Sequence, residues 1–332
     1  VQTCALPILS WFEWISDTFA ALQMGLFETV VQPVAFAVGA GNLLEVAYEG
    51  TGWLLVGLLQ IGVMVCIITP LEKWRPVETV TDPQAVRVDI FYTLIHRLGL
   101  FKLLMFFTFE NLVENVFGEL RVHGFPTLHI DAVWPGVTDT ALVSFLIYLV
   151  VMDAIHYFIH RGQHKFDRWW ALHSLHHSQR QMTLWTDNRN HLLDDVFTTL
   201  ILSIVAKLIG VSPGQFVALV ALSQLSENFQ HANFRFSFGA WGERLWVSPR
   251  FHRLHHAVGI GHESAGRQTL GGHNFGVLFP WWDMLLGTAD FTDRYDATGV
   301  RDQVEDGRDY GRGFWSQQVL GFARFFKGGA SA

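Results

Sequence analysis

Residues 160–177 read HRGQHKFDRWWALHSLHH and contain a histidine pair spaced i, i+4 followed by a triplet spaced i, i+3, i+4. About eighty residues later, HRLHH repeats the triplet. On a helix these spacings share one face, so each box directs two or three imidazoles toward one point, as metal ligands require. The eight box histidines are His160, His164, His173, His176, His177, His252, His255 and His256.

The composition indicates a membrane protein. Of the 332 residues, 50% are hydrophobic and only 16% are charged, and the apolar residues gather in runs of near-spanning length. This distribution is typical of a polytopic all-α membrane protein. The net charge of −7, with no basic stripe, excludes nucleic acid as the expected partner.

Residues 53–69 carry no charge and end at Pro70, which predicts a membrane-spanning helix. Residues 11–38 are apolar but interrupted by acids and Pro33, so they fit either an interfacial amphipathic helix or a first span. The expected architecture is about four membrane helices, namely three spans plus a helical hairpin. The other predicted membrane segments are residues 90–109, residues 140–160, and a hairpin of residues 196–211 and 215–229.

Lysine and arginine follow the first and third predicted spans, which by the positive-inside rule makes residues 71–89 and 161–190 cytoplasmic. The histidine boxes then belong to a cytoplasmic helical cap of an integral protein, expected in a bacterial inner membrane.

We divide the chain accordingly. Residues 1–8 match what a sequencing adapter would encode when read in frame, and we exclude them from fold reasoning. Residues 9–50 form an N-terminal membrane segment, residues 51–290 a catalytic membrane domain, and residues 291–332 a polar tail. We expect the tail to be a solvated appendage without catalytic residues.

Eight imidazoles exceed the needs of one ion, and His231, in QHANF, is a plausible ninth ligand. Two metals with about four histidines each would leave open coordination positions, as a catalytic site requires. Imidazole suits iron, zinc, copper and nickel, so the spacing does not name the metal. Asp153 lies two turns before His160 inside an apolar stretch, where we interpret it as a residue that orients a ligand.

No nucleophile elbow, Walker loop or dinucleotide-binding glycine pattern is present, so a metal must do the chemistry. At the membrane edge, redox metals point to O₂-dependent oxidation of a long acyl, alkyl or sterol chain. Two other classes remain as alternatives. One is a His-rich membrane metal transporter or metal-binding protein, and the other is a membrane zinc hydrolase.

Several motifs together resemble the fatty acid hydroxylase / sterol desaturase superfamily, and look most like its alkylglycerol monooxygenase-like bacterial branch. The resemblance covers about residues 70–288. The motifs are DAIHYFIHRGQH at 153–164, HSLHHS at 173–178, RNH at 189–191, QHANF at 230–234, PRFHRLHH at 249–256 and NFGVLFPWWDMLLGT at 274–288.

The resemblance implies two iron ions, with zinc as an alternative in the purified protein. It also implies O₂ as co-substrate, an external electron-transfer partner, and a four-helix scaffold beneath a cytoplasmic cap. Carried over, the ligands are the eight box histidines and His231, with His191 a weaker candidate as ligand or supporting residue. Asn274, Trp282 and Asp283 match the closing motif as structural support, Asp283 as a residue that orients an imidazole. His156 stands where an aromatic is usual, and we interpret it as supporting the ligands. Hydroxylation, desaturation and cleavage of an ether lipid share these ligands and stay open.

Overall fold

A computed structural model describes residues 7–258 and 272–327 of the chain. Within these residues the structure is helical, with a single isolated β-bridge between Ala257 and Thr298 and no strand. The predicted all-α class is therefore confirmed.

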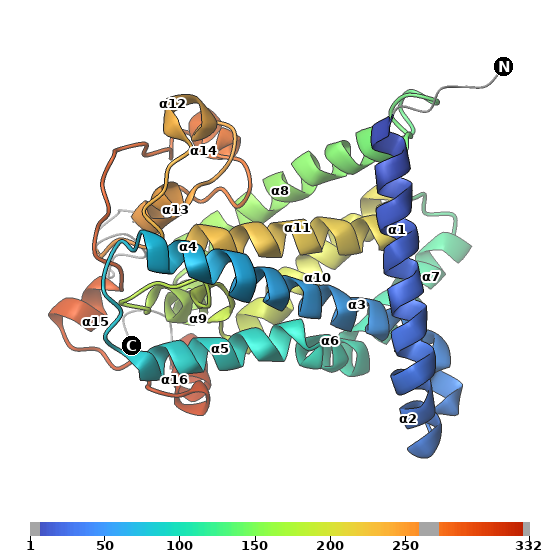
Figure 1. Cartoon of the computed structure of the whole chain (residues 1–332), viewed down its shortest axis with the longest axis horizontal. Coiled ribbons are helices and arrows are strands. Elements are labelled where there is room, and N and C mark those ends of the chain that lie inside the picture. The colour runs from blue at the N-terminus through green and yellow to red at the C-terminus, as the bar shows by residue number, and fades with distance from the viewer. Residues whose placement is uncertain (1–6, 259–271, 328–332) are drawn as a thin grey trace.

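Long helices run side by side and form the scaffold (Figure 1). Three of these helices meet in an apolar core that contains Tyr148, Met152, Ala206 and Leu219. The scaffold helices are α3 (Leu44–Val63), continued by η3 (Met64–Ile68) and α4 (Thr69–Trp74), together with α5 (Pro83–Arg97), α8 (Ala141–Lys165), α10 (Leu192–Ile209) and α11 (Pro213–His231).

The remaining elements lie at the two ends of the scaffold. The end opposite the cap holds α1 (Pro7–Leu26), η1 (Phe27–Val31), α2 (Gln32–Ala37), η2 (Gly41–Leu43), α6 (Leu100–Met105), η4 (Phe106–Glu110) and α7 (Asn111–Val122). The cap consists of α9 (Asp167–His177), η5 (Thr186–Asn188), α12 (Gly239–Gly242), α13 (Pro249–His255), α14 (Trp281–Leu286), α15 (Arg301–Glu305) and α16 (Phe314–Lys327).

The chain is an integral membrane protein. Among the described residues, three helical stretches are long and apolar enough to cross a bilayer: Trp14–Ala37, Gly41–Trp74 and Ala141–Lys165. The last two confirm the predicted spans. The first crosses the scaffold helices at a steep angle (Figure 1), an orientation that suits the interfacial alternative better than a parallel span.

The apolar segment predicted as a span at residues 90–109 is present, but it is bent. The chain turns by 53° between Pro83–Arg97 and Leu100–Val122, a pair that is long and apolar enough for one broken span or a re-entrant loop. The cause is Gly99, whose φ of +82° places the chain in the left-handed region that ends a helix.

The predicted hairpin is present as α10 and α11. Gly210 ends α10 with a φ of +83°, and Ser212 begins α11 with a capping box formed with Gln215. Neither helix is among the three apolar stretches, because acids and amides occupy α10 and α11 where they face the interior of the bundle.

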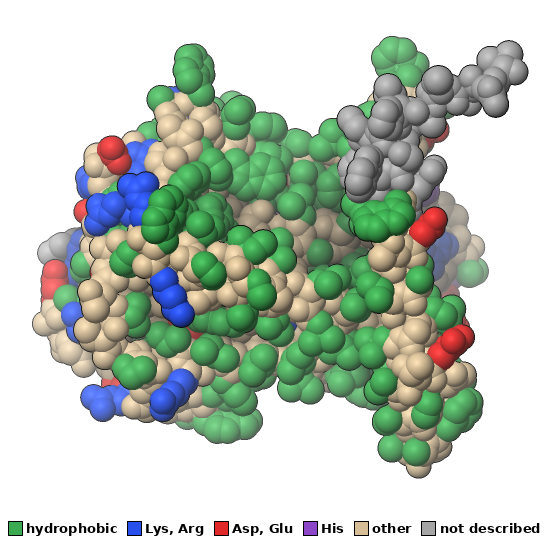
Figure 2. All heavy atoms as spheres, viewed as in Figure 1, with side chains coloured by type: hydrophobic (Ala, Val, Ile, Leu, Met, Phe, Trp, Pro, Cys, Tyr) green, Lys and Arg blue, Asp and Glu red, His purple; other side chains and the backbone are tan. Residues whose placement is uncertain are grey.

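The two segments predicted to share a membrane face lie at the same end of the bundle. The Gln181 Oε1 of residues 161–190 accepts from the Thr81 and Asp82 nitrogens of residues 71–89 at 2.8 and 3.0 Å. Lysine and arginine side chains gather at this cap end, while hydrophobic side chains cover the scaffold (Figure 2).

The expectation of a solvated C-terminal tail is wrong. Tyr310 is buried with Trp170 and Val300, and α16 packs against α9. Some of the tail's charged residues pair with each other, as in the Arg308–Asp302 ion pair at 2.8 Å, and the Tyr310 hydroxyl donates to Asp302 at 3.0 Å, so a high charge content is compatible with a packed segment.

Candidate metal centre

Four helices deliver histidines to one place in the cap. The scaffold helix α8 extends into the cap and carries His160 and His164 in its last turns, and α11 ends at His231. Between α8 and α9, Phe166 adopts an extended conformation that turns the chain back, so the face of α9 that bears the HSLHH box meets α8. The short helix α13 starts at the Ser248 cap, which accepts from the Phe251 nitrogen, and carries the second triplet.

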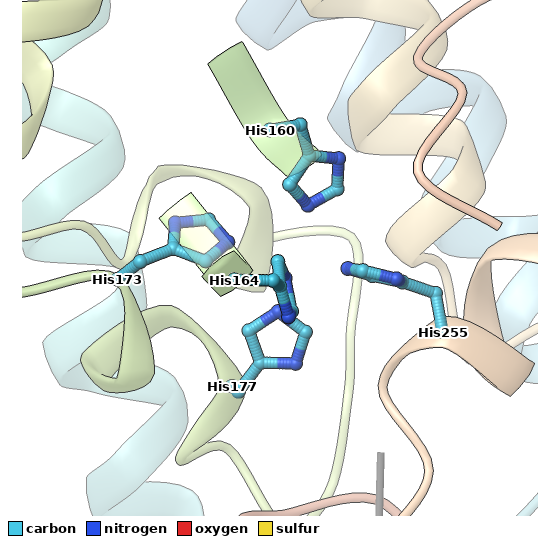
Figure 3. A group of neighbouring side chains, drawn as sticks. All are labelled: His160, His164, His173, His177 and His255. Atoms are coloured by element: carbon cyan, nitrogen blue, oxygen red, sulfur yellow. The ribbon is translucent and has the colours of Figure 1, made fainter. Parts of the chain in front are cut away.

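The first histidine group contains five buried imidazoles, each offering one nitrogen within 4.8 Å of the others. Figure 3 shows these rings pointing toward a common centre from α8, α9 and α13. The members of this group are His160, His164, His173, His177 and His255.

The second group brings four Nε2 atoms together. Those of His176 and His252 lie 3.1 and 2.9 Å from that of His231, and the His256 Nε2 lies 3.2 Å from that of His252. A metal about 2.0–2.1 Å from four tetrahedral nitrogens would hold them roughly 3.3 Å apart. The group therefore has the dimensions of a metal site.

The two groups adjoin each other. Consecutive residues on α9, His176 and His177, belong to different groups, as do His255 and His256 at the end of α13. The rings of His177 and His256 stack across the boundary with centroids 4.2 Å apart. All nine histidines predicted as ligands thus lie in two neighbouring groups, the arrangement expected of a two-metal centre.

Hydrogen bonds at Nδ1 direct several imidazoles inward. The Nδ1 atoms of His160 and His255 contact the carbonyl oxygens of Phe275 and His273 at 2.9 and 2.8 Å. With Nδ1–H donating there, Nε2 keeps its lone pair for a metal. The His255 Nε2 is buried and has no hydrogen-bond partner within the described residues, which fits this role.

The protonation state also fits metal binding. Burial, reinforced by neighbouring imidazoles, holds the pKa of His177, His252 and His256 well below the usual range. These rings are therefore neutral at physiological pH, the form that binds a metal.

Sequence reasoning missed Asp194. Its Oδ2 accepts from the His173 Nδ1 at 3.1 Å, while its Oδ1 accepts from the Trp169 Nε1 at 2.6 Å and the Gln163 Nε2 at 2.8 Å. Asp194 is buried in the first turn of α10. The sequence does contain a pattern that could have identified Asp194: a carboxylate just after the RNH motif, at the start of an apolar helix.

The predicted orienting role of Asp153 is wrong. Its carboxylate accepts from the backbone nitrogens of Leu278 and Phe279 at 2.8 and 3.3 Å and from the Trp282 Nε1 at 2.8 Å. It makes no hydrogen bond to a histidine in the described part of the chain. Asp153 thus attaches the motif at residues 274–288 to α8. Its buried carboxylate is satisfied by these three N–H donors.

Asp283 supports an imidazole indirectly. It accepts from the backbone nitrogens of Phe275 and Gly276 at 2.9 and 2.7 Å, which holds the Phe275 carbonyl against His160. Burial raises the pKa of Asp283 to about 6. Asn274 adopts a φ of +61°, and its Nδ2 donates to the carbonyl oxygens of Phe251 and Asp290 at 3.0 and 2.9 Å.

His191 and His156 lie outside both groups. The His191 Nδ1 accepts from the Leu193 nitrogen at 3.2 Å, and its Nε2 contacts the Gln318 carbonyl at 2.8 Å. His191 therefore caps α10, and no ring nitrogen is left for a metal. His156 lines the cavity beside His160.

A cavity of about 260 Å³ connects the histidines to the interior of the scaffold. Its cap end is lined by His160 and His176, among others, and its far end by Trp53, Phe101 and Phe216. The histidines therefore share a cavity with both apolar and charged side chains. Arg97 and Glu227 line it as well, and the Lys102 Nζ lies 4.0 Å from the centre of the Trp53 ring.

Residues 145–288 match the family described as Fatty acid hydroxylase. Over 193 residues the chain is 26% identical to ornithine lipid hydroxylase OlsE of Rhizobium tropici, covering 58% of this chain and 54% of that protein. It is 24% identical to alkylglycerol monooxygenase of Caenorhabditis elegans over 56% of this chain and 34% of that protein. It is 25% identical to fatty acid hydroxylase vlmA of a Lecanicillium species over 50% of this chain and 46% of that protein.

The chain spans about half the length, or less, of these curated relatives. No solved structure matches it. The resemblance inferred from the histidine boxes, including the relation to alkylglycerol monooxygenase, is confirmed.

Proposed function

Because the chain is a relative of the fatty acid hydroxylases, we propose that it is a membrane-bound, O₂-dependent oxidoreductase that hydroxylates a lipid. The observation that carries the proposal is the pair of adjoining all-histidine groups at the mouth of a cavity that runs into the membrane scaffold.

We assign the nine histidines as ligands of two iron ions. Iron bound there would supply O₂ activation: with two electrons from an external donor and two protons from solvent, one oxygen atom would enter a C–H bond as hydroxyl and the other would leave as water. Imidazole-only sites of open geometry suit redox iron, although they also accept zinc. The protein's part is to hold the rings by their Nδ1 contacts and to exclude water from the reacting carbon.

The cavity supports a substrate that has an apolar chain and a polar group. Aromatic and aliphatic side chains of α3, α6 and α11 line its far end, and the Lys102 ammonium lies among them, over the Trp53 ring. The matched relatives carry the names of hydroxylases or a monooxygenase of lipids, with an ornithine lipid, an alkylglycerol or a fatty acid in the name. An acyl, alkyl-ether or sterol-like chain of the bilayer is therefore the proposed substrate class.

The alternatives fit less well. A metal transporter would place ligands along a path near the membrane centre, whereas here they gather at one end of the bundle. A zinc hydrolase needs only three protein ligands and an open position on one ion, fewer than the nine imidazoles that the two groups supply.

We further propose that the cap end faces the cytoplasm of a bacterial inner membrane, because lysine and arginine concentrate there (Figure 2). An electron-transfer partner would then meet the protein on this side.

The proposed function is tested by growing cells that express the active gene under ¹⁸O₂ and analysing their lipids by mass spectrometry. We expect a lipid that carries one ¹⁸O and that disappears with His176→Ala. The control is His123→Ala, because His123 lies at the end of α7 with its side chain 77% exposed. An unchanged lipid profile in the presence of iron-loaded protein would contradict the proposal.

A further inference from the structure

The C-terminal helix α16 has its polar and apolar faces inverted. Gln317, Gly321 and Arg324 are buried on the inner side. The outer side carries large apolar residues at positions i, i+4, i+7 and i+11, which form one stripe along the helix. These residues are Trp315, 77% exposed, Val319, 65%, Phe322, 51%, and Phe326, 64%.

This stripe lies beside a scaffold helix. The Gln318 Nε2 donates to the Tyr92 hydroxyl of α5 at 2.9 Å, and the Phe314 ring lies 4.9 Å from the Tyr92 ring and 5.2 Å from the Phe91 ring. Phe91 is itself 48% exposed and belongs to the first half of the broken span. The apolar surface of α16 therefore continues onto a helix that contributes to a span.

A second apolar face lies across the cap. Leu285 of α14 is 75% exposed and Met284 is 42% exposed. The Trp282 Nε1 donates to the Asp153 Oδ2 at 2.8 Å, which fixes α14 beside the span Ala141–Lys165. Figure 1 shows α14 and α16 on opposite sides of the cap end of the bundle.

We propose that α16 lies in the interfacial layer of the bilayer, with its stripe against the acyl chains and the bilayer as its partner. With 14 residues it is too short to span, since a crossing helix needs about 20. The large apolar residues of its outer side, including a tryptophan, adjoin a helix that contributes to a span, as in an amphipathic helix that lies in the interface plane. Together with α14, it seats the cap in the membrane surface, so the histidine groups lie at interface depth.

Hydrogen bonds also connect α16 to the start of α10, which holds an aspartate that contacts the first histidine group. The Gln318 Oε1 accepts from the Leu192 nitrogen at 2.9 Å, and its backbone oxygen contacts the His191 Nε2 at 2.8 Å. These contacts hold the start of α10, two residues before Asp194, which bonds His173. The position of α16 in the bilayer is therefore linked to the orientation of a histidine in the first group.

The proposal is tested with spin labels on the full chain, in a background with Cys4→Ser and Cys66→Ser, reconstituted in phosphatidylcholine–phosphatidylglycerol nanodiscs. Labels are placed at Val319→Cys and Phe322→Cys, with Glu305→Cys on the exposed cap surface as the control. Relaxation by O₂, which concentrates in lipid, is compared with relaxation by a water-soluble nickel chelate.

We expect O₂ to dominate at positions 319 and 322 and the nickel chelate to dominate at position 305. Nickel access at 319 and 322 equal to that at 305 would place the stripe in water and overturn the proposal. Protection from both agents would mean that protein covers the stripe, which overturns it as well. The measurement needs neither substrate nor turnover, so its outcome is independent of the proposed hydroxylase activity.

Discussion

Replacing Asp194 with asparagine tests how the first histidine group is oriented. The two carboxylate oxygens of Asp194 serve opposite sides: Oδ1 accepts from Trp169 and Gln163, and Oδ2 accepts from the His173 Nδ1 at 3.1 Å. Asparagine keeps the shape but has only one acceptor oxygen. If that oxygen stays with the two donors Trp169 and Gln163, the amide NH₂ faces the His173 Nδ1.

His173 must then place its proton on Nε2, the atom that faces the metal, and this tautomer cannot ligate. Loss of an orienting partner of this kind costs about 10- to 100-fold in metal affinity, or about 1.4–2.7 kcal/mol. We therefore expect Asp194→Asn to bind iron about 10- to 100-fold more weakly and to lose turnover in proportion.

The assay is iron content by elemental analysis at a series of chelator concentrations, with helicity by circular dichroism as the check on folding. The matched control is Asp195→Asn. Asp195 is the next residue, similarly placed in the first turn of α10, and it pairs with His96 at 3.2 Å instead of with a histidine of either group. Equal iron affinity in wild type and Asp194→Asn, or an equal loss in both variants, would refute the reasoning.

Three further predictions concern the two groups and the scaffold. His255→Ala and His252→Ala each remove one imidazole from a different group, so we expect each to lower bound metal, as measured by elemental analysis; full metal content in either would remove that histidine from the ligand set. Asn274→Ala should lower stability by about 1–3 kcal/mol, and more than Asn274→Gly, because only glycine tolerates the φ of +61° without strain; thermal unfolding with the reverse order would contradict this. Gly57→Ala should destabilise by about 1–3 kcal/mol, because an added Cβ would clash with the Arg97 backbone oxygen, whereas Gly62→Ala on the same helix meets nothing within 4 Å and should raise stability by about 0.5–1 kcal/mol in the same measurement.

The histidine spacing predicted which residues converge because helical periodicity alone places residues 173, 176 and 177 on neighbouring positions of one face. The spacing could not show that His176 and His177 serve different groups. That division depends on where α11 and α13 approach α9, and such tertiary placement leaves no mark in the local sequence.

The supports of the ligands were harder to predict. His160 and His255 rest on the backbone carbonyls of Phe275 and His273, and a carbonyl is present at every position of a chain. Asp153 looked like an orienting residue because it shares a helix with His160, yet its carboxylate faces the closing motif instead. Direction around the helix, not proximity in sequence, decides the partner.

The C-terminal region was misjudged for a related reason. Its high content of charged residues suggested that it is solvated. The spacing of its apolar residues is the better guide: positions 315, 319, 322 and 326 form an apolar stripe, and the polar positions 317 and 324 face the cap. Composition alone does not reveal this amphipathic helix, in which the polar side packs against the protein and the apolar side is exposed.

Mössbauer spectroscopy of the purified protein loaded with ⁵⁷Fe, with iron quantified on the same sample, tests the central claim most directly. Two adjoining histidine groups predict about two protein-bound iron ions per chain. One iron per chain, or a site that takes up zinc and refuses iron, would contradict a di-iron centre.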